Sequence, residues 1–296
     1  MPRVTALSTL TYPDLHLGEA LERIAARGFR TVDIAHMSVY CRHFHLGAAE
    51  TEGQRGLLRT LGLQPIALNY YGGESDPLQP AAPRTHRLYV TEEAARYREM
   101  MHRVILQCRS LGIPLLMVVP NRRGEEAEQP EAIAATAAVI SAVADEAYAN
   151  GLRVTVEAPH CFNQLHSVER LAEFFGYVTS PHVGVTVDCS HWGVLRYDLE
   201  ALWDAVGPRI FHVHLRDSAG PDTNDFLQQL ELTPGSGEVD FARFGAWLDS
   251  HGYRGNVTME LEYRGRATAD IEIEVDRALA HLAAVGWTLP HGVSPR

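Results

Sequence analysis

Four polar side chains occur at the carboxyl ends of predicted β-strands in the second half of the chain. Each follows a β-branched run such as Val154–Val156 or Val185–Val187. The four residues are Glu157, Asp188, His214 and Glu260. A single carboxylate at a strand end usually faces solvent or caps a helix. Stability alone does not explain why four successive strands each end in such a residue. In a parallel α/β barrel, the carboxyl end of the strands carries the functional site.

Together these four side chains would form a site for a divalent cation. Three carboxylates within reach of one another repel, and burial adds to that cost, so a bound cation would stabilise them. Three oxygen ligands and one imidazole suit Mn²⁺, Mg²⁺ or Co²⁺, whereas zinc usually has more nitrogen and sulfur ligands. We therefore expect one divalent metal ion, with Mn²⁺ preferred and Mg²⁺, Co²⁺ or Zn²⁺ as alternatives.

Further polar residues lie beside the four. Glu262 competes with Glu260, which we prefer because it stands where the apolar strand ends. His212 alternates with His214 one layer deeper, so we expect it to orient the ligands. His160 and Asp217 could each orient a ligand as well. Asp33 and His36, on the second predicted strand, could touch substrate or a second metal.

The sequence gives no support for two other chemistries. It contains no glycine-rich phosphate loop of the Walker type. Cys189 lies beside His191 but also beside the carboxylate of Asp188, which would raise the pKa of a thiol. The four cysteines form no CxxC pair, which in a chain of this size favours reduced thiols in the cytoplasm.

The elements that must position these residues alternate between strand and helix along all 296 residues. Eight such pairs predict an α/β fold in which a parallel sheet closes into a single (β/α)8 TIM barrel. Residues 1–296 form one domain, with a tail from about Pro290 to Arg296 that we expect to be loosely attached. The predicted strands are Val4–Leu10, Thr31–His36, Pro65–Tyr70, Leu115–Val119, Arg153–Glu157, Gly184–Asp188, Ile210–Leu215 and Val257–Leu261. The predicted helices are Leu17–Ala26, Glu50–Leu61, Thr91–Leu111, Pro130–Asn150, Val168–Phe175, Leu199–Val206, Phe241–His251 and Ala269–Val285.

The composition argues against nucleic-acid and membrane partners. The formal net charge of −11 is unsuited to binding a phosphate backbone. The N-terminus lacks the apolar run of a signal peptide, and we find no segment with the roughly 18 apolar residues of a membrane span. We expect a cytoplasmic protein; whether it forms homo-oligomers stays open, since Trp192 and Trp203 suit a core or an interface equally.

The loops after the first three strands are the expected source of substrate specificity. They cover about Thr11–Asp14, Met37–Gly47 and Tyr70–Arg84. Cys189 and Ser190 are expected to form a turn that places His191 just beyond the strand. The candidate substrate contacts in the specificity loops are Tyr40, His43, His45, Tyr70 and Tyr71.

At this level of detail the chain resembles the xylose isomerase-like TIM barrels, the sugar phosphate isomerase/epimerase family. The resemblance covers nearly the whole chain, and its motifs are specific as a set rather than singly. They are Leu17–Gly28 with Val32-Asp-Ile, Leu111-Gly-Ile-Pro, Glu157-Ala-Pro-His160, Val183–His191, His212–Asp217, Pro234–Phe241 and Met259-Glu260.

The resemblance implies a metal-dependent mechanism. In ketose epimerases of this family a Glu, Asp, His, Glu set binds one metal, which here corresponds to the four residues above. The two glutamates, Glu157 and Glu260, would remove and return a proton beside a carbonyl through a metal-held enediolate. The histidine of the Asp-x-x-His motif, His191, would contact substrate oxygens. The further predicted substrate contacts are His160, Arg216 and His36, with His212 and Asp217 orienting the ligands.

One departure from the epimerase pattern keeps alternatives open. Those epimerases have an arginine six residues after the metal histidine, where this chain has Gly220. Arg216 and Asp217 instead follow His214, as in the inosose dehydratase-like branches. We expect a sugar isomerase or epimerase acting on a sugar or polyol. The alternatives are a dehydratase of a keto-inositol or related keto-sugar, a sugar-binding barrel without turnover and, with low weight, an AP endonuclease-like nuclease.

Overall fold

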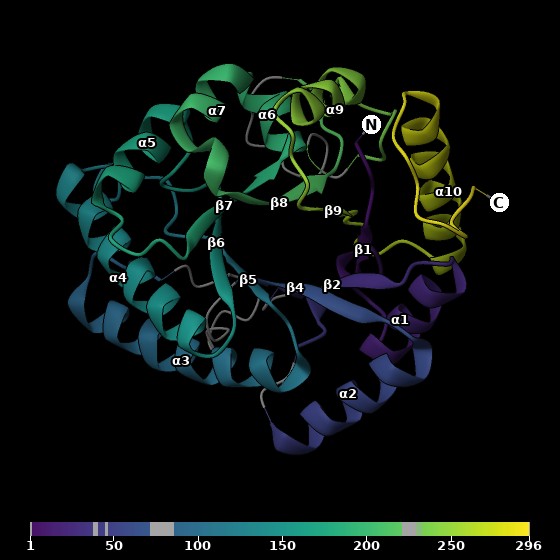
Figure 1. The fold of residues 1–296 in the computed structure, drawn as a ribbon, viewed down its shortest axis with the longest axis horizontal. Coiled ribbons are helices and arrows are strands. Elements are labelled where there is room, and N and C mark those ends of the chain that lie inside the picture. Colours follow the sequence, from purple (N-terminus) through teal and green to yellow (C-terminus); the bar gives the residue numbers. More distant parts are fainter. Residues whose placement is uncertain are drawn as a thin grey trace.

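Eight parallel strands close into a barrel surrounded by helices, which confirms the predicted (β/α)8 architecture (Figure 1). This computed structural model describes residues 2–37, 41–44, 47–71, 86–220, 230 and 232–295. The barrel closes because β1 pairs in parallel with both β2 and β9. The barrel strands are β1 (Ala6–Ser8), β2 (Thr31–Met37), β4 (Gln64–Tyr71), β5 (Leu115–Val118), β6 (Arg153–Glu157), β7 (Val183–Asp188), β8 (Ile210–Leu215) and β9 (Asn256–Met259).

The helices form the outer layer because each presents one apolar face to the strands. Leu21 and Ile24 of α1 and Leu171 and Phe174 of α5 are buried in this way. The helices are α1 (Leu17–Ala26), α2 (Ala48–Leu61), α3 (Thr91–Leu111), α4 (Pro130–Ala149), α5 (Val168–Tyr177), α6 (Cys189–Leu195), α7 (Leu199–Val206), α9 (Phe241–Ser250) and α10 (Thr268–Ala284), with short 3-10 turns η1 (Thr9–Thr11) and η2 (Gly207–Arg209).

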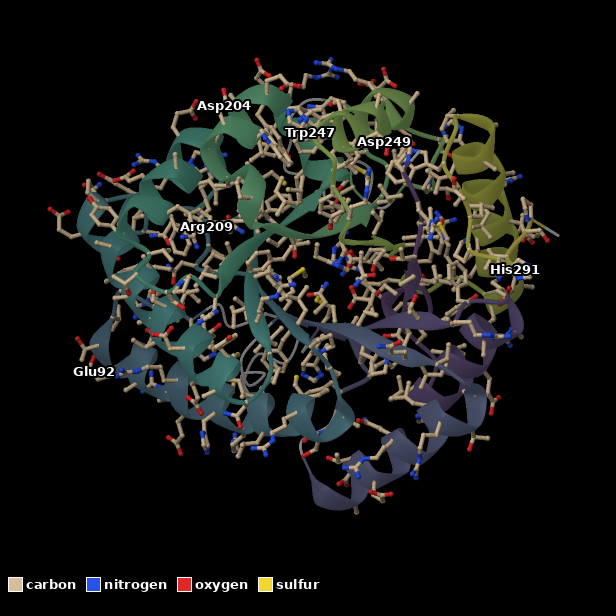
Figure 2. All side chains as sticks on the ribbon, viewed as in Figure 1. Glu92, Asp204, Arg209, Trp247, Asp249 and His291 are labelled. Carbon is tan, nitrogen blue, oxygen red and sulfur yellow. The ribbon has the colours of Figure 1, made fainter. Side chains whose placement is uncertain are left out.

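Apolar side chains fill the space between the two layers. Trp247 of α9 is buried and packs edge-on against Trp203 of α7. Glu92, Asp204 and His291 are exposed and lie at the periphery of the molecule (Figure 2). Among the described residues, α4 is the one helix long and apolar enough to cross a membrane, but it packs against α3, α5 and β6 as a core helix.

Two local predictions near the barrel mouth were wrong. The segment after Asp188 is not a turn but helix α6, because the Asp188 carboxylate accepts a hydrogen bond from the Ser190 N–H at 2.7 Å and caps it. The segment after β2 was expected to be loop throughout, yet β3 (Cys41–Arg42) pairs antiparallel with β2. In both cases the element is too short to show a periodic pattern.

The C-terminal tail is attached to the barrel more firmly than expected. Val293 is buried in the main core cluster. Gly28, which ends α1 with φ of 95°, lies so close that a Cβ atom there would be 2.4 Å from the Gly292 carbonyl oxygen. The tail therefore packs over the loop after α1, at least as far as Val293.

Candidate metal centre and active site

The strand-end residues converge at the carboxyl end of the barrel. β6, β7, β8 and β9 are consecutive neighbours, so the side chains at their ends point into one space. One ligand atom from each of four residues lies within 4.8 Å of the others, and all four residues are buried. We call this set the mouth cluster: Glu157, Asp188, His214 and Glu260.

His214 is held so that one ring nitrogen faces the other members of the cluster. Its Nε2 is 3.1 Å from Asp33 Oδ2, and because a carboxylate only accepts, Nε2 carries a proton. Its Nδ1 is 3.1 Å from Glu260 Oε2 and 3.8 Å from Glu157 Oε1. Nδ1 is buried without a well-aligned hydrogen-bond partner among the described residues. A carboxylate behind one nitrogen and an open second nitrogen is the arrangement of a metal-binding imidazole.

The charges in the mouth cluster also fit a cation. Burial raises the pKa of Glu157 to about 7; His214 opposes this shift, while Glu260 and Asp188 add to it. Burial disfavours a charged His214, yet Glu260 and Asp33 raise the pKa of its imidazole well above the usual range. In the metal-free chain, protons must therefore offset the carboxylate charge. A divalent cation would offset it directly, so this donor set fits a metal ion.

Arg216, predicted to contact substrate, is buried and forms two ion pairs. Its Nη2 donates to Asp188 Oδ2 at 2.8 Å and its Nη1 donates to Glu262 Oε2 at 2.9 Å. Arg216 thus positions Asp188, whose other oxygen caps α6. Glu262 is engaged by this arginine and is not part of the mouth cluster, which favours Glu260 as the ligand.

His160 and His191 stand together beside Glu157. Their ring centroids are 3.9 Å apart, and their Nε2 atoms lie 3.9 and 4.0 Å from the Glu157 carboxylate oxygens. Burial chiefly lowers the pKa of both imidazoles well below the usual range, so both are neutral near pH 7. His160 Nδ1 accepts from the Phe162 N–H at 3.2 Å, which leaves the proton on Nε2. The pair can therefore offer hydrogen bonds to substrate oxygens.

His212 and Asp217, which were both expected to orient metal ligands, have different surroundings. His212 Nε2 lies 3.2 Å from Asp33 Oδ2 and 3.1 Å from Thr258 Oγ1, beneath His214. Asp217, by contrast, accepts four backbone hydrogen bonds and no bond from the mouth cluster. Its donors are the N–H groups of Ser218, Gly235, Gly237 and Val239. Asp217 therefore organises the segment from 233 to 239.

The candidate contacts on the early strands are only partly described. His36 stacks on Tyr70 with ring centroids 5.1 Å apart, so both lie at the ends of β2 and β4. His43 is buried and its Nε2 lies 2.8 Å from the Leu15 carbonyl oxygen, away from the mouth cluster. Tyr40 and His45 lie outside the described residues.

Asn69 is the functional residue that sequence reasoning missed. It is fully buried on β4, and its Nδ2 donates to Glu260 Oε1 at 2.6 Å across the barrel. A polar side chain directly after the apolar run from Ile66 to Leu68, inside a predicted strand, was the available signal. Asn69 fixes one oxygen of Glu260 and leaves the other near His214.

Comparison with known proteins gives a family and several relatives. A model of the xylose isomerase-like TIM barrel family matches residues 21–285. The chain is 26% identical to the 3-dehydroshikimate dehydratase of Pseudomonas putida over 251 residues, 83% of this chain and 36% of that protein. It is 22% identical to the inosose isomerase of Bacillus subtilis over 205 residues, 67% of this chain and 68% of that protein. The chain thus spans just over a third of the dehydratase.

Solved structures show the same fold. A D-psicose 3-epimerase crystallised in the presence of D-fructose has a TM-score of 0.73 at 17% identity, covering 96% of this chain and 99% of that chain. The IOLI protein with a bound zinc atom has a TM-score of 0.72 at 20% identity, covering 95% of this chain and 96% of that chain.

Proposed function

Because the chain belongs to the xylose isomerase-like TIM barrel family, we propose that it is a divalent-metal-dependent isomerase or epimerase of a sugar or polyol. The observation that carries the proposal is the mouth cluster, in which four buried ligand atoms lie within 4.8 Å of one another. A divalent cation there would polarise a substrate carbonyl and acidify the neighbouring C–H bond. The relatives named as an inosose isomerase and a D-psicose 3-epimerase support this reaction class.

Glu157 and Glu260 are the proposed proton carriers. They come from the two outer strands of the four-strand arc, so a substrate between them would face one carboxylate on each side. One glutamate would remove the proton beside the carbonyl, and the other would return a proton to the opposite face. His191 and His160, both neutral, would hold the substrate oxygens.

A dehydratase is the second candidate, and a specific observation favours it. The dehydratase relative has the highest identity of the four proteins compared and aligns with 83% of this chain. Removal of a proton beside a carbonyl is also the first step of a β-elimination that expels water. The same two glutamates would serve both reactions. The two reactions differ only in whether the substrate hydroxyl is kept or expelled as water.

We further propose Mn²⁺ as the metal and the cytoplasm as the compartment. The oxygen-rich donor set favours a hard cation, although the IOLI protein holds zinc. The four cysteines are free and buried, as in proteins of reducing compartments.

The test is incubation of the Mn²⁺-loaded chain with inosose and with 3-dehydroshikimate in deuterated water. Deuterium in a product of unchanged composition supports an isomerase or epimerase, whereas a product lacking one water supports the dehydratase. Glu157→Gln and Glu260→Gln should each abolish the reaction, while Glu238→Gln, at an exposed surface ion pair, should not. Binding without deuterium uptake from any ring ketone or ketose tested would leave only the sugar-binding barrel.

A further inference from the structure

A tyrosine, an arginine and a glutamate follow one another around the barrel mouth, at or just after the ends of three neighbouring strands. β4 pairs with β5, and β5 pairs with β6. Tyr71 ends β4, Arg122 follows β5 by four residues, and Glu157 ends β6. Tyr71 and Arg122 thus extend the mouth beyond the proposed catalytic arc, next to Glu157.

The backbone of Arg122 is fixed over the segment that carries His160. Arg122 forms an antiparallel bridge with Asn163, flanked by the Gln164 N–H to Asn121 carbonyl bond of 2.7 Å and the Arg123 N–H to Phe162 carbonyl bond of 3.0 Å. Asn163 in turn donates from Nδ2 to the Glu157 carbonyl at 3.1 Å. The position of Arg122 relative to the mouth cluster is therefore built into the fold.

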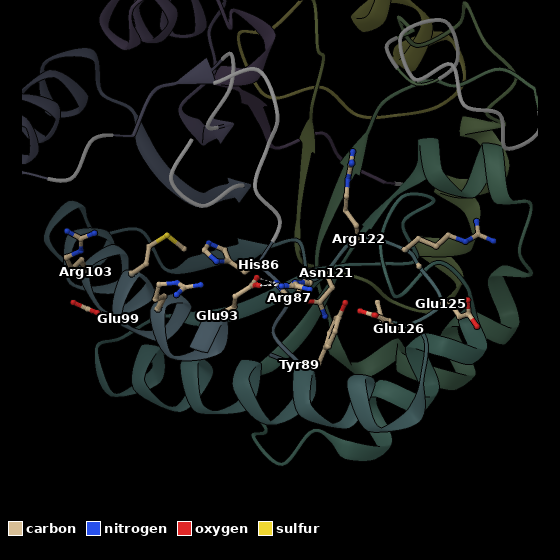
Figure 3. Close-up of a pocket in the computed structure, with 15 residues that line it drawn as sticks. His86, Arg87, Tyr89, Glu93, Glu99, Arg103, Asn121, Arg122, Glu125 and Glu126 are labelled. Atoms are coloured by element: carbon tan, nitrogen blue, oxygen red, sulfur yellow. Dashed lines mark hydrogen bonds and ion pairs between the residues drawn. The ribbon is translucent and has the colours of Figure 1, made fainter. Parts of the chain in front are cut away.

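The charge of Arg122 is not neutralised by the described residues. No described carboxylate lies within 4.0 Å of its guanidinium, whereas Arg87 pairs with Glu93 at 2.6 Å and Arg123 with Glu128 at 3.7 Å. Arg87, Glu93, Arg122 and Arg123 line a cavity of about 1010 Å³ between α3 and the segment after β5. Within it, Arg122 extends away from Arg87 and Glu93 (Figure 3).

The Tyr71 phenol lies close enough to the Arg122 guanidinium and to the Glu157 carboxylate for both charges to affect its pKa. Burial raises the pKa of its phenol, the Arg122 guanidinium opposes that rise, and Glu157 adds to it. Tyr71 and Arg122 thus form a paired donor group, one neutral and one cationic, beside an otherwise acidic site.

We propose that Arg122 and Tyr71 bind an acidic group of the substrate, so that the substrate is an anionic polyhydroxylated ketone rather than a neutral sugar. This inference rests on the proposed function. Three carboxylates and a histidine with one divalent cation do not attract an anion, so an anionic substrate needs a fixed cation nearby. A guanidinium with an adjacent hydroxyl suits a carboxylate or a phosphate, which share this recognition chemistry.

The experiment compares three probes on the Mn²⁺-loaded chain: 3-dehydroshikimate carries a carboxylate, D-fructose 6-phosphate carries a phosphate, and inosose is neutral. Dissociation constants, or KM where a probe turns over, are measured for wild type, Arg122→Gln, Arg122→Lys and the neighbouring control Arg123→Gln. We expect Arg122→Gln to weaken one anionic probe by roughly 10- to 100-fold and inosose by less than about twofold. Arg122→Lys should weaken that probe less, and Arg123→Gln should leave it unchanged.

The anionic probe that is affected identifies the group as carboxylate or phosphate. Equal binding of all three probes by the wild type would overturn the inference, as would an equal loss for anionic and neutral probes in Arg122→Gln. Manganese stoichiometry and thermal unfolding of each variant show that the mouth cluster is intact. If Arg122→Gln leaves anion binding unchanged while deuterium exchange persists, this inference fails and the proposed function stands.

Discussion

Asp33 contacts both histidines of β8 and so determines which nitrogen of His214 is open. Although burial opposes its ionisation, hydrogen bonds from His212 and His214 lower the pKa of Asp33 to about 2. The carboxylate therefore stays charged and keeps the proton on His214 Nε2. We predict that Asp33→Asn weakens Mn²⁺ binding by roughly 10- to 100-fold because the amide no longer fixes this tautomer. Calorimetric titration measures the Mn²⁺ affinity of each variant, with Asp14→Asn, at an exposed position, as the control. Unchanged Mn²⁺ affinity in Asp33→Asn would contradict the role of Asp33 in positioning His214.

Glu157 makes metal binding sensitive to pH. In the metal-free chain its pKa is raised to about 7, so it is largely protonated at pH 6 and ionised at pH 8. A metal ion must displace this proton and also the one on His214 Nδ1, whose pKa is raised as well, so affinity should fall as the pH drops, with Glu157 adding up to about tenfold per unit below pH 7. Calorimetry in two buffers of different ionisation enthalpy counts the released protons. Equal affinity at pH 6 and pH 8 with no proton release would count against Glu157 as a ligand.

At the scale of elements, α6 and β7 share Asp188, which caps the helix with one oxygen and receives Arg216 with the other. Asparagine can still cap a helix, whereas alanine cannot. Both variants should lose the metal, but Asp188→Ala should be less stable than Asp188→Asn by about 1 kcal/mol in urea unfolding of the metal-free chain. Equal stabilities would mean that the cap contributes nothing to α6.

The segment from 233 to 239 depends on Asp217, whose carboxylate accepts four backbone hydrogen bonds. In Asp217→Asn an amide N–H₂ would face backbone donors, which should destabilise the chain by about 1–3 kcal/mol. Manganese stoichiometry should stay at one because Asp217 does not contact the mouth cluster. Asp198→Asn, at the exposed cap of α7, is the matched control. Loss of metal without loss of stability would instead assign Asp217 to the metal centre.

Strands and helices were largely predictable because alternating apolar runs and helical caps are local in sequence. The bounds of α1, α3, α7, β6 and β8 agree with the prediction. The missed α6 spans seven residues, too few for a periodic signal. Local patterns also indicated which residues gather at the mouth, since parallel strands end on one face.

The contacts across the barrel were not predictable in the same way. Asn69 reaches Glu260 over 191 residues, and Asp33 reaches His214 over 181 residues. Both contacts depend on how the barrel closes and on the stagger of its strands, which no short window of sequence contains. The ion pair that occupies Arg216 likewise depends on the relative placement of β7, β8 and the segment after β9.

At the scale of the whole molecule, the mouth cluster joins four consecutive strands, so a bound cation would tie β6, β7, β8 and β9 together. A ligand that binds only the folded state adds about 2.7 kcal/mol at 100 times its Kd. For a chain of this size that corresponds to a rise in Tm of roughly 5 °C. We predict this rise when Mn²⁺ is added to the chelated protein and its absence in Glu157→Gln with Asp188→Asn. If neither Tm nor metal content changes in the wild type, the cluster does not hold a cation, and proton transfer assisted by a metal is no longer tenable.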